Sequence, residues 1–121
     1  MAKADRKTST SKAKKPAKID PSILALERHR KADQVFFARA RVADQRRGDQ
    51  KAEQKMNLAS DAADNLAWEL ATTEPTTIAG ASAVLNYIVE GPAVGLFDLG
   101  ETAWHETAFK TVAAALAKLA A

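Results

Sequence analysis

Cysteine is absent from this sequence of 121 residues. Its absence excludes disulfide bonds, thiolate metal sites and a thiol nucleophile, and it is compatible with a reducing cytoplasm. Only 6% of the residues are aromatic, five are glycine and four are proline. The chain also lacks a sustained alternation of apolar and polar residues and any apolar run long enough to cross a membrane. These absences argue against a β-sheet domain, a disulfide-stabilised secreted domain and a membrane-spanning protein.

The residues that are abundant point to helices. Hydrophobic residues make up 46% of the chain, and much of that share is alanine, which favours helices but buries little area. We therefore expect a thin core made by close helix packing. The length fits one domain. The composition predicts a single all-α domain over residues 19–121.

The net charge of +3 hides a strong asymmetry. Residues 1–18 carry seven bases and one acid, and the remainder carries eleven bases and fourteen acids. A segment this polar cannot bury enough surface to become ordered, so we expect a disordered basic tail. It has no apolar run typical of a secretory signal, which favours a cytoplasmic protein. Its bases could bind nucleic acid through the phosphate backbone: Lys3, Arg6, Lys7, Lys12, Lys14, Lys15 and Lys18.

Two long amphipathic segments follow the tail. Asp20 and the proline after it are typical of a helix start, and apolar residues then recur at three- and four-residue steps to about residue 46. Gly48 is suited to end this helix, and Asp49 could cap the next, which we expect over residues 50–72. The pattern predicts an antiparallel helical hairpin. One continuous helix through Gly48 is the alternative, because a single glycine costs only about 1 kcal/mol.

A second segment, nearly uncharged over residues 76–90, follows Pro75. We expect a short third helix over about residues 77–89, more buried than the others, in which Gly80 permits close approach of a neighbouring backbone. Residues 91–100 form an apolar loop that we expect to fold over the core. A C-terminal amphipathic helix is predicted over about residues 101–120, and both helices should pack on the hairpin.

The two histidines suggest a metal hypothesis. Asp33 follows His29 by four residues and Glu101 precedes His105 by four, so each pair lies on one helix face and could offer two ligands. The plainer interpretation makes His29 a partly buried polar residue and His105 an exposed one. Phosphate-binding loops, nucleophile elbows and other catalytic motifs are missing, so the sequence argues against an enzyme, and we expect no cofactor.

The order of several short motifs resembles a known set of proteins. They are Asp20-Pro21, Glu-Arg-His-Arg at residues 27–30, Pro-Thr-Thr-Ile-Ala-Gly at 75–80, Leu-Asn-Tyr at 85–87, Trp104-His105 and the alanine-rich run at 111–119. Together they resemble a set of small uncharacterised helical proteins of alphaproteobacteria, notably rhizobia. The resemblance implies a bacterial, cytoplasmic, helical protein and transfers no functional residue.

The sequence therefore predicts a long antiparallel hairpin that carries a short apolar helix and a C-terminal amphipathic helix. For function, we expect a non-enzymatic interaction or structural protein that self-associates or binds a helical partner, because an alanine-rich hairpin buries little area by itself. Nucleic-acid binding through the tail is the alternative function, and a metal-dependent enzyme is a remote one.

Overall fold

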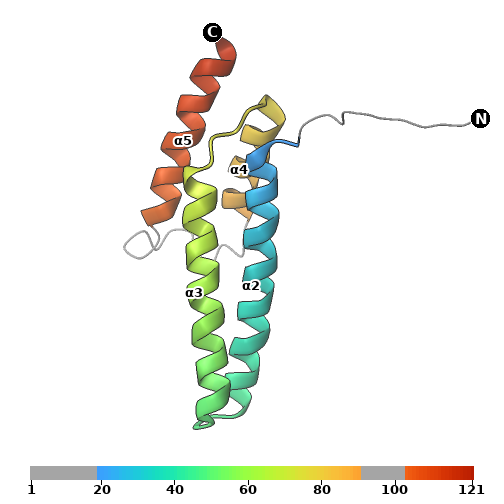
Figure 1. The fold of residues 1–121 in the computed structure, drawn as a ribbon, viewed down its shortest axis with the longest axis vertical. Coiled ribbons are helices and arrows are strands. Elements are labelled where there is room, and N and C mark those ends of the chain that lie inside the picture. The colour runs from blue at the N-terminus through green and yellow to red at the C-terminus, as the bar shows by residue number, and fades with distance from the viewer. Residues whose placement is uncertain (1–18, 91–102) are drawn as a thin grey trace, which may run out of the picture.

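The computed structural model describes residues 19–90 and 103–121 (Figure 1). Within these residues the chain forms helices and no strand, which confirms the all-α fold class. The helices are α2 (Pro21–Gln45), α3 (Gln50–Thr72), α4 (Ile78–Glu90) and α5 (Ala103–Ala120).

The first two helices form the predicted antiparallel hairpin (Figure 1). Gly48 has a φ of 87°, a left-handed backbone conformation that glycine adopts without strain, so the turn is real and the continuous-helix alternative is wrong. Asp49 then caps α3, because its carboxylate accepts hydrogen bonds from the backbone N–H groups of Lys51 and Ala52. Local sequence signals thus fix both sides of the turn.

The helices pack in a ring at one end of the hairpin. Helix α2 contacts α3 and α4, and α5 contacts α3 and α4. Both shorter helices lie beside the half of the hairpin that holds the start of α2 and the end of α3, while the other half projects beyond them (Figure 1). The main apolar cluster lies in the four-helix half, and in the other half the buried apolar side chains are alanines such as Ala43, Ala52 and Ala59. The cluster consists of Ala25, Leu26, Leu70, Ala71, Ala81, Val84, Ile88, Ala108 and Val112.

Asp20 joins the start of α2 to the start of α4. Its side chain accepts hydrogen bonds from the backbone and hydroxyl groups of Ser22, at 2.9 and 2.7 Å. It also accepts from the N–H groups of Thr76 and Thr77, both at 3.0 Å, and from the Thr77 hydroxyl at 2.7 Å. One carboxylate therefore holds two helix starts that lie 57 residues apart in sequence.

This junction corrects the role expected of Gly80. A Cβ atom at this position would collide with the Asp20 carboxylate, lying 2.5 Å from its Cγ, and would sit 2.9 Å from the Ser22 hydroxyl. The missing side chain of Gly80 thus makes room for the Asp20 carboxylate, and not for a neighbouring backbone. The expectation that this helix is more buried than the others holds, since four of its 13 residues are buried, against five of 25 in α2 and six of 23 in α3, although Ile78 and Val89 are 58% and 63% exposed.

Some predictions concern residues outside the described ranges. The basic tail over residues 1–18, the apolar loop over 91–100 and Glu101 are among them. Across residues 19–90 and 103–121, no helix combines the length and apolarity that crossing a bilayer requires.

Candidate functional site

A buried polar cluster surrounds His29, where α2 meets α4 and α5. The imidazole is 6% exposed, and its Nδ1 lies 2.5 Å from the hydroxyl of Tyr87 on α4. Its other nitrogen, Nε2, lies 3.8 Å from a carboxylate oxygen of Asp33, one turn further along α2. The cluster thus places a phenol, an imidazole and a carboxylate next to one another in space, in that order.

Aromatic rings enclose the same histidine. The Tyr87 ring meets it edge-on at 5.6 Å between centroids, and the Trp104 ring lies 5.5 Å away. Trp104 also stacks on His105, at 3.9 Å between centroids. The structure therefore brings both histidines to one tryptophan. His105 is 6% exposed, so its interpretation as an exposed residue is wrong.

Burial dominates the protonation of this cluster. It lowers the pKa of His29, although the carboxylates of Asp33 and Asp64 act in the opposite direction. Burial raises the pKa of Asp33, and the nearby charge of Asp64 adds to this effect while His29 opposes it. Burial and the charge of Asp33 raise the pKa of Tyr87 to about 12. Tyr87 therefore stays a neutral phenol beside Nδ1, and the tautomer of the imidazole sets which of the two groups donates the hydrogen bond.

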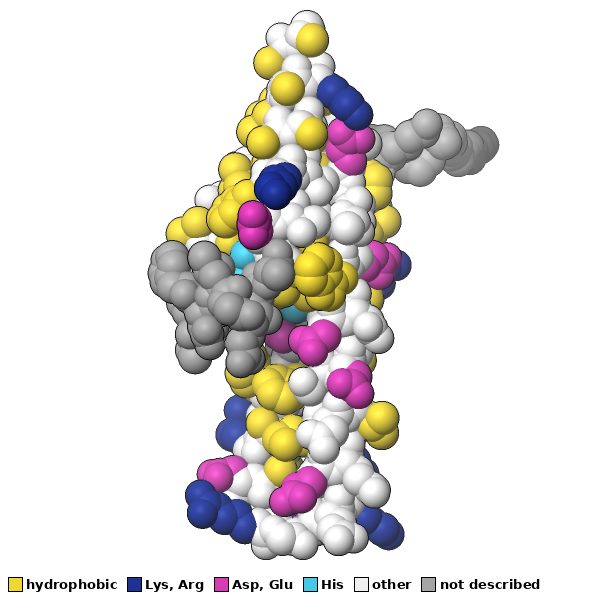
Figure 2. All heavy atoms as spheres, turned by 90° about the vertical axis from the view of Figure 1, so that its left-hand side faces the viewer, with side chains coloured by type: hydrophobic (Ala, Val, Ile, Leu, Met, Phe, Trp, Pro, Cys, Tyr) yellow, Lys and Arg dark blue, Asp and Glu magenta, His cyan; other side chains and the backbone are white. Residues whose placement is uncertain are grey.

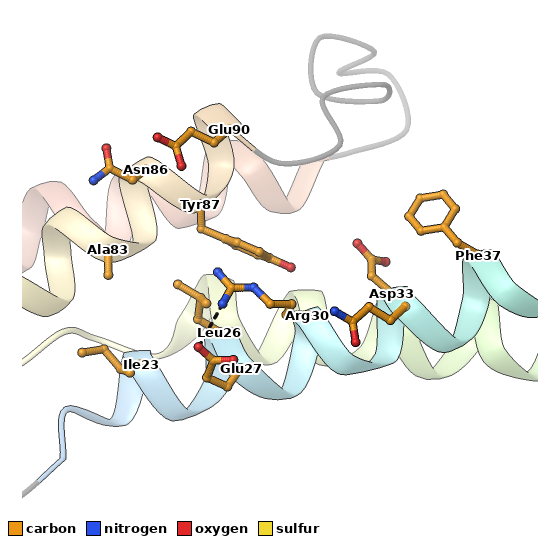
Figure 3. Close-up of a pocket in the computed structure, with 11 residues that line it drawn as sticks. Ile23, Leu26, Glu27, Arg30, Asp33, Phe37, Ala83, Asn86, Tyr87 and Glu90 are labelled. Atoms are coloured by element: carbon orange, nitrogen blue, oxygen red, sulfur yellow. Dashed lines mark hydrogen bonds and ion pairs between the residues drawn. The ribbon is translucent and has the colours of Figure 1, made fainter.

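A groove of about 530 Å³ lies beside the cluster, between α2 and α4 (Figure 3). Tyr87 projects from α4 toward Arg30 and Asp33 on α2. The apolar part of the lining includes Ile23, Leu26, Phe37 and Ala83, and the charged part consists of Glu27, Arg30, Asp33 and Glu90.

The single base in this lining is held in place. Arg30 forms an ion pair with Glu27 at 3.0 Å, and its guanidinium lies 5.3 Å from the centroid of the Tyr87 ring. Three carboxylates against one engaged guanidinium favour a cationic group over an anionic one in the groove. The cluster offers a hydrogen-bonded phenol, but the sequence contains no cysteine and none of the described contacts places a serine against His29 as a nucleophile.

The metal hypothesis finds only part of its ligand set together. His29 and Asp33 lie close together, and the ring of Trp104 lies near both histidines. In the part of the chain that the structure describes, no three side chains of His, Asp or Glu are grouped so as to hold a metal ion. Glu101 lies outside that part.

Sequence reasoning did not single out a second charged feature, at the end of the hairpin. Residues 39–55 carry six bases and three acids, whereas the other described residues carry five bases and nine acids. A hollow of about 160 Å³ there is lined by Arg39, Arg46, Lys51 and Lys55, together with Asp49. Figure 2 shows Lys and Arg side chains at this end of the molecule. Charge is thus unevenly distributed over the described residues, with a basic end of the hairpin and a net acidic remainder.

Tyr87 and Trp104 were also missed as partners of His29. Tyr87 lies 58 residues from the histidine in sequence, so no local spacing connects them. Only composition could have pointed to them, because the chain has one tyrosine and two tryptophans. When buried, such aromatic residues with a polar group usually find a hydrogen-bond partner.

Comparisons of the chain with family models, with curated proteins and with solved structures find no match. The resemblance to the alphaproteobacterial set therefore stays a prediction.

Proposed function

We propose that this protein is a non-enzymatic helical interaction protein that self-associates through its hairpin. The observation that carries the proposal is the projecting half of α2 and α3, which neither α4 nor α5 covers (Figure 1). Hydrophobic side chains are visible on its surface in Figure 2. Two helices that pack only on each other bury little apolar area, and a partner would cover the apolar side chains that they leave exposed.

The exposed side chains on the hairpin support this function. Val35 and Val42 on α2 are 49% and 40% exposed, and Leu58 on α3 is 70% exposed. Complete burial of a fully exposed side chain of this kind contributes about 1.5–3 kcal/mol, so covering the exposed parts of several of them favours association.

Sedimentation velocity of the full-length protein from about 1 μM to about 1 mM tests the proposal, because this range covers weak dimers. We expect the average mass to rise from monomer toward dimer across this range. Leu58→Gln should shift the equilibrium toward monomer without lowering the melting temperature at low concentration, since this side chain is already exposed. Ile78→Gln is the matched control, because Ile78 is 58% exposed but lies on α4. A wild-type monomer throughout the range would contradict self-association.

A further inference from the structure

The outward face of α3 carries a regular stripe. From Lys51, alternating steps of four and three residues lead through positions that are all exposed: Lys55, Leu58, Ala62, Asn65, Glu69 and Thr72. This spacing averages 3.5 residues, which keeps side chains on one line when two helices pack along each other. The opposite face of the helix is buried against its own chain, with Ala63 and Ala67 at 5% and 1% exposure. The stripe is thus a second packing face.

Charge along this stripe changes sign from one end to the other. Lys51 and Lys55 lie near the start, Leu58 and Ala62 lie in the middle, and Glu69 lies near the end. After residue 55, α3 carries no further base. A stripe with this order is complementary to a second copy of itself turned end to end.

One register satisfies the charges and the apolar residues together. Lys51 and Glu69 each lie nine residues from Ser60, and Leu58 and Ala62 each lie two residues from it. An antiparallel pair centred on Ser60 therefore sets each lysine opposite a glutamate and each leucine opposite an alanine. Centring the pair on Ala62 instead would place Leu58 near the polar Asn65, so the first register is favoured.

We propose that two copies of this chain pack through their α3 stripes, antiparallel, about a twofold axis level with Ser60. Lys51 of each copy then approaches Glu69 of the partner subunit, a carboxylate that within each chain also forms an ion pair with Arg28, and Leu58 packs on Ala62 of the partner subunit. This arrangement rests on the self-association proposed above and specifies its geometry. A twofold contact of this kind closes at the dimer, because each copy uses the same surface.

Helix α2 extends the apolar centre of the interface. Arg28 forms an ion pair with Glu69, and Arg39 shares a hollow with Lys55, which fixes how the two helices are aligned. Val35 lies between Arg28 and Arg39 in sequence and therefore lies near the level of Ser60. Its 49% exposed side chain adds to the apolar centre on each copy.

The size of the stripe predicts a weak dimer. From Lys51 to Thr72 it is roughly 32 Å long, at 1.5 Å per residue. One pair of helices of this length buries an area near the lower limit of specific interfaces, about 1,200 Å² in total. We therefore expect a dissociation constant in the micromolar range that rises with salt, since the rim is ionic.

Charge reversal in the full-length protein tests the register. Lys51→Glu and Glu69→Lys should each raise the dimer dissociation constant about tenfold, because each places two like-charged pairs across the axis. An equimolar mixture of the two variants should recover dimers, since the mixed dimer restores opposite charges at both positions. Full recovery supports the arrangement. A mixture no better than either variant overturns it.

Cysteine cross-linking tests the orientation without competing background, because the chain has no native cysteine. A mixture of Lys51→Cys and Glu69→Cys should form a mixed disulfide on oxidation, and neither variant alone should form one efficiently. Asn86→Cys is the control, because Asn86 is an exposed residue on α4, away from the α3 stripe. Wild-type dimers without the mixed disulfide would overturn the antiparallel register while leaving self-association intact, whereas a monomeric wild type would remove both. If Lys51→Glu leaves the dimer unchanged and instead abolishes binding of duplex DNA, the lysines serve a polyanion and the arrangement is wrong.

Discussion

The carboxylate of Asp20 occupies the space that a Cβ atom at Gly80 would fill. The two residues are 60 positions apart, yet the absence of a side chain at one lets the other cap the start of α2 and bind the segment leading into α4. Because the same carboxylate holds the starts of both helices, its loss should lower the stability of the fold by more than the loss of a single helix cap.

Replacing Asp20 should destabilise the fold by about 2–4 kcal/mol in Asp20→Ala, since two helix starts lose their acceptor and buried donors lose their partner. Chemical denaturation at neutral pH measures this change. Asp49→Ala is the control, because Asp49 caps only α3, and it should cost about 1 kcal/mol. Equal effects of the two substitutions would contradict the double role.

The same residue predicts an acid dependence. Burial alone would raise the pKa of Asp20, but hydrogen bonds from Thr77, Ser22 and Thr76 outweigh it and lower the pKa from 3.8 to about 2. A lowered pKa in the folded state gives stability that is complete above the unfolded value and is lost as the pH falls toward about 2. This shift corresponds to about 2 kcal/mol. Unfolding followed from pH 5 to pH 2 should show this loss, and Asp20→Asn should reduce it.

Gly80→Ala sets two effects against each other. Alanine raises helix propensity by about 1 kcal/mol, but the new Cβ displaces the Asp20 carboxylate. We expect the clash to dominate, with a net destabilisation of about 1–3 kcal/mol. In an Asp20→Ala background the penalty should shrink, since the two nearest atoms to the new Cβ belong to the Asp20 carboxylate, and the next is the Ser22 hydroxyl at 2.9 Å. A penalty of the same size in both backgrounds would show that the two residues act independently.

His29 predicts a second dependence on pH. Because burial lowers its pKa in the folded state, the unfolded chain binds the proton more readily, and stability should fall as the pH drops below about 6.5. Asp33, with a raised pKa, acts in the opposite direction at lower pH. Denaturation between pH 7.5 and 5 should show the fall, and His29→Gln should flatten it. A titration of the His29 ring by NMR that gave an ordinary or raised pKa would contradict this account.

Polyanion binding by residues 1–18 is tested separately. The full-length protein should shift arbitrary duplex DNA in a gel at low salt, and the shift should weaken steeply as salt rises. Replacing the seven bases of this segment by glutamine should abolish it. Lys51→Gln with Lys55→Gln is the matched control and should leave it unchanged. Binding that survives neutralisation of the segment would exclude this function for it.

The parts of the fold that the sequence predicted are those with short-range causes. Asp20 and Asp49 are caps whose targets lie two or three residues away, and Gly48 meets a backbone requirement at its own position. Apolar residues at helical spacing indicated which face of each helix is buried. These features depend only on local geometry, so a single sequence suffices to find them.

The parts that it did not predict depend on contacts between distant segments. The hydroxyl of Tyr87 meets His29 across 58 positions, and the Asp20 carboxylate meets Thr77 across 57. Which side chains meet at such distances is decided by how far each helix is rotated and shifted against its neighbour, and periodicity alone leaves both undetermined. The metal hypothesis illustrates this limit, because two correctly spaced pairs do not by themselves make one site.

The projecting half of the hairpin has a consequence for backbone amide exchange. Its hydrogen bonds can open without disturbing Leu70, Val84 or Ile88, which lie in the core at the other end. Protection against deuterium should therefore decline along α2 toward Gln45 and rise again along α3 from Gln50. Within residues 19–90 and 103–121, the turn at Gly48 should be the first place a protease cuts. A second copy packed on α3 would raise protection along the projecting half and so flatten this gradient. Exchange rates at two protein concentrations would therefore map the contact residue by residue.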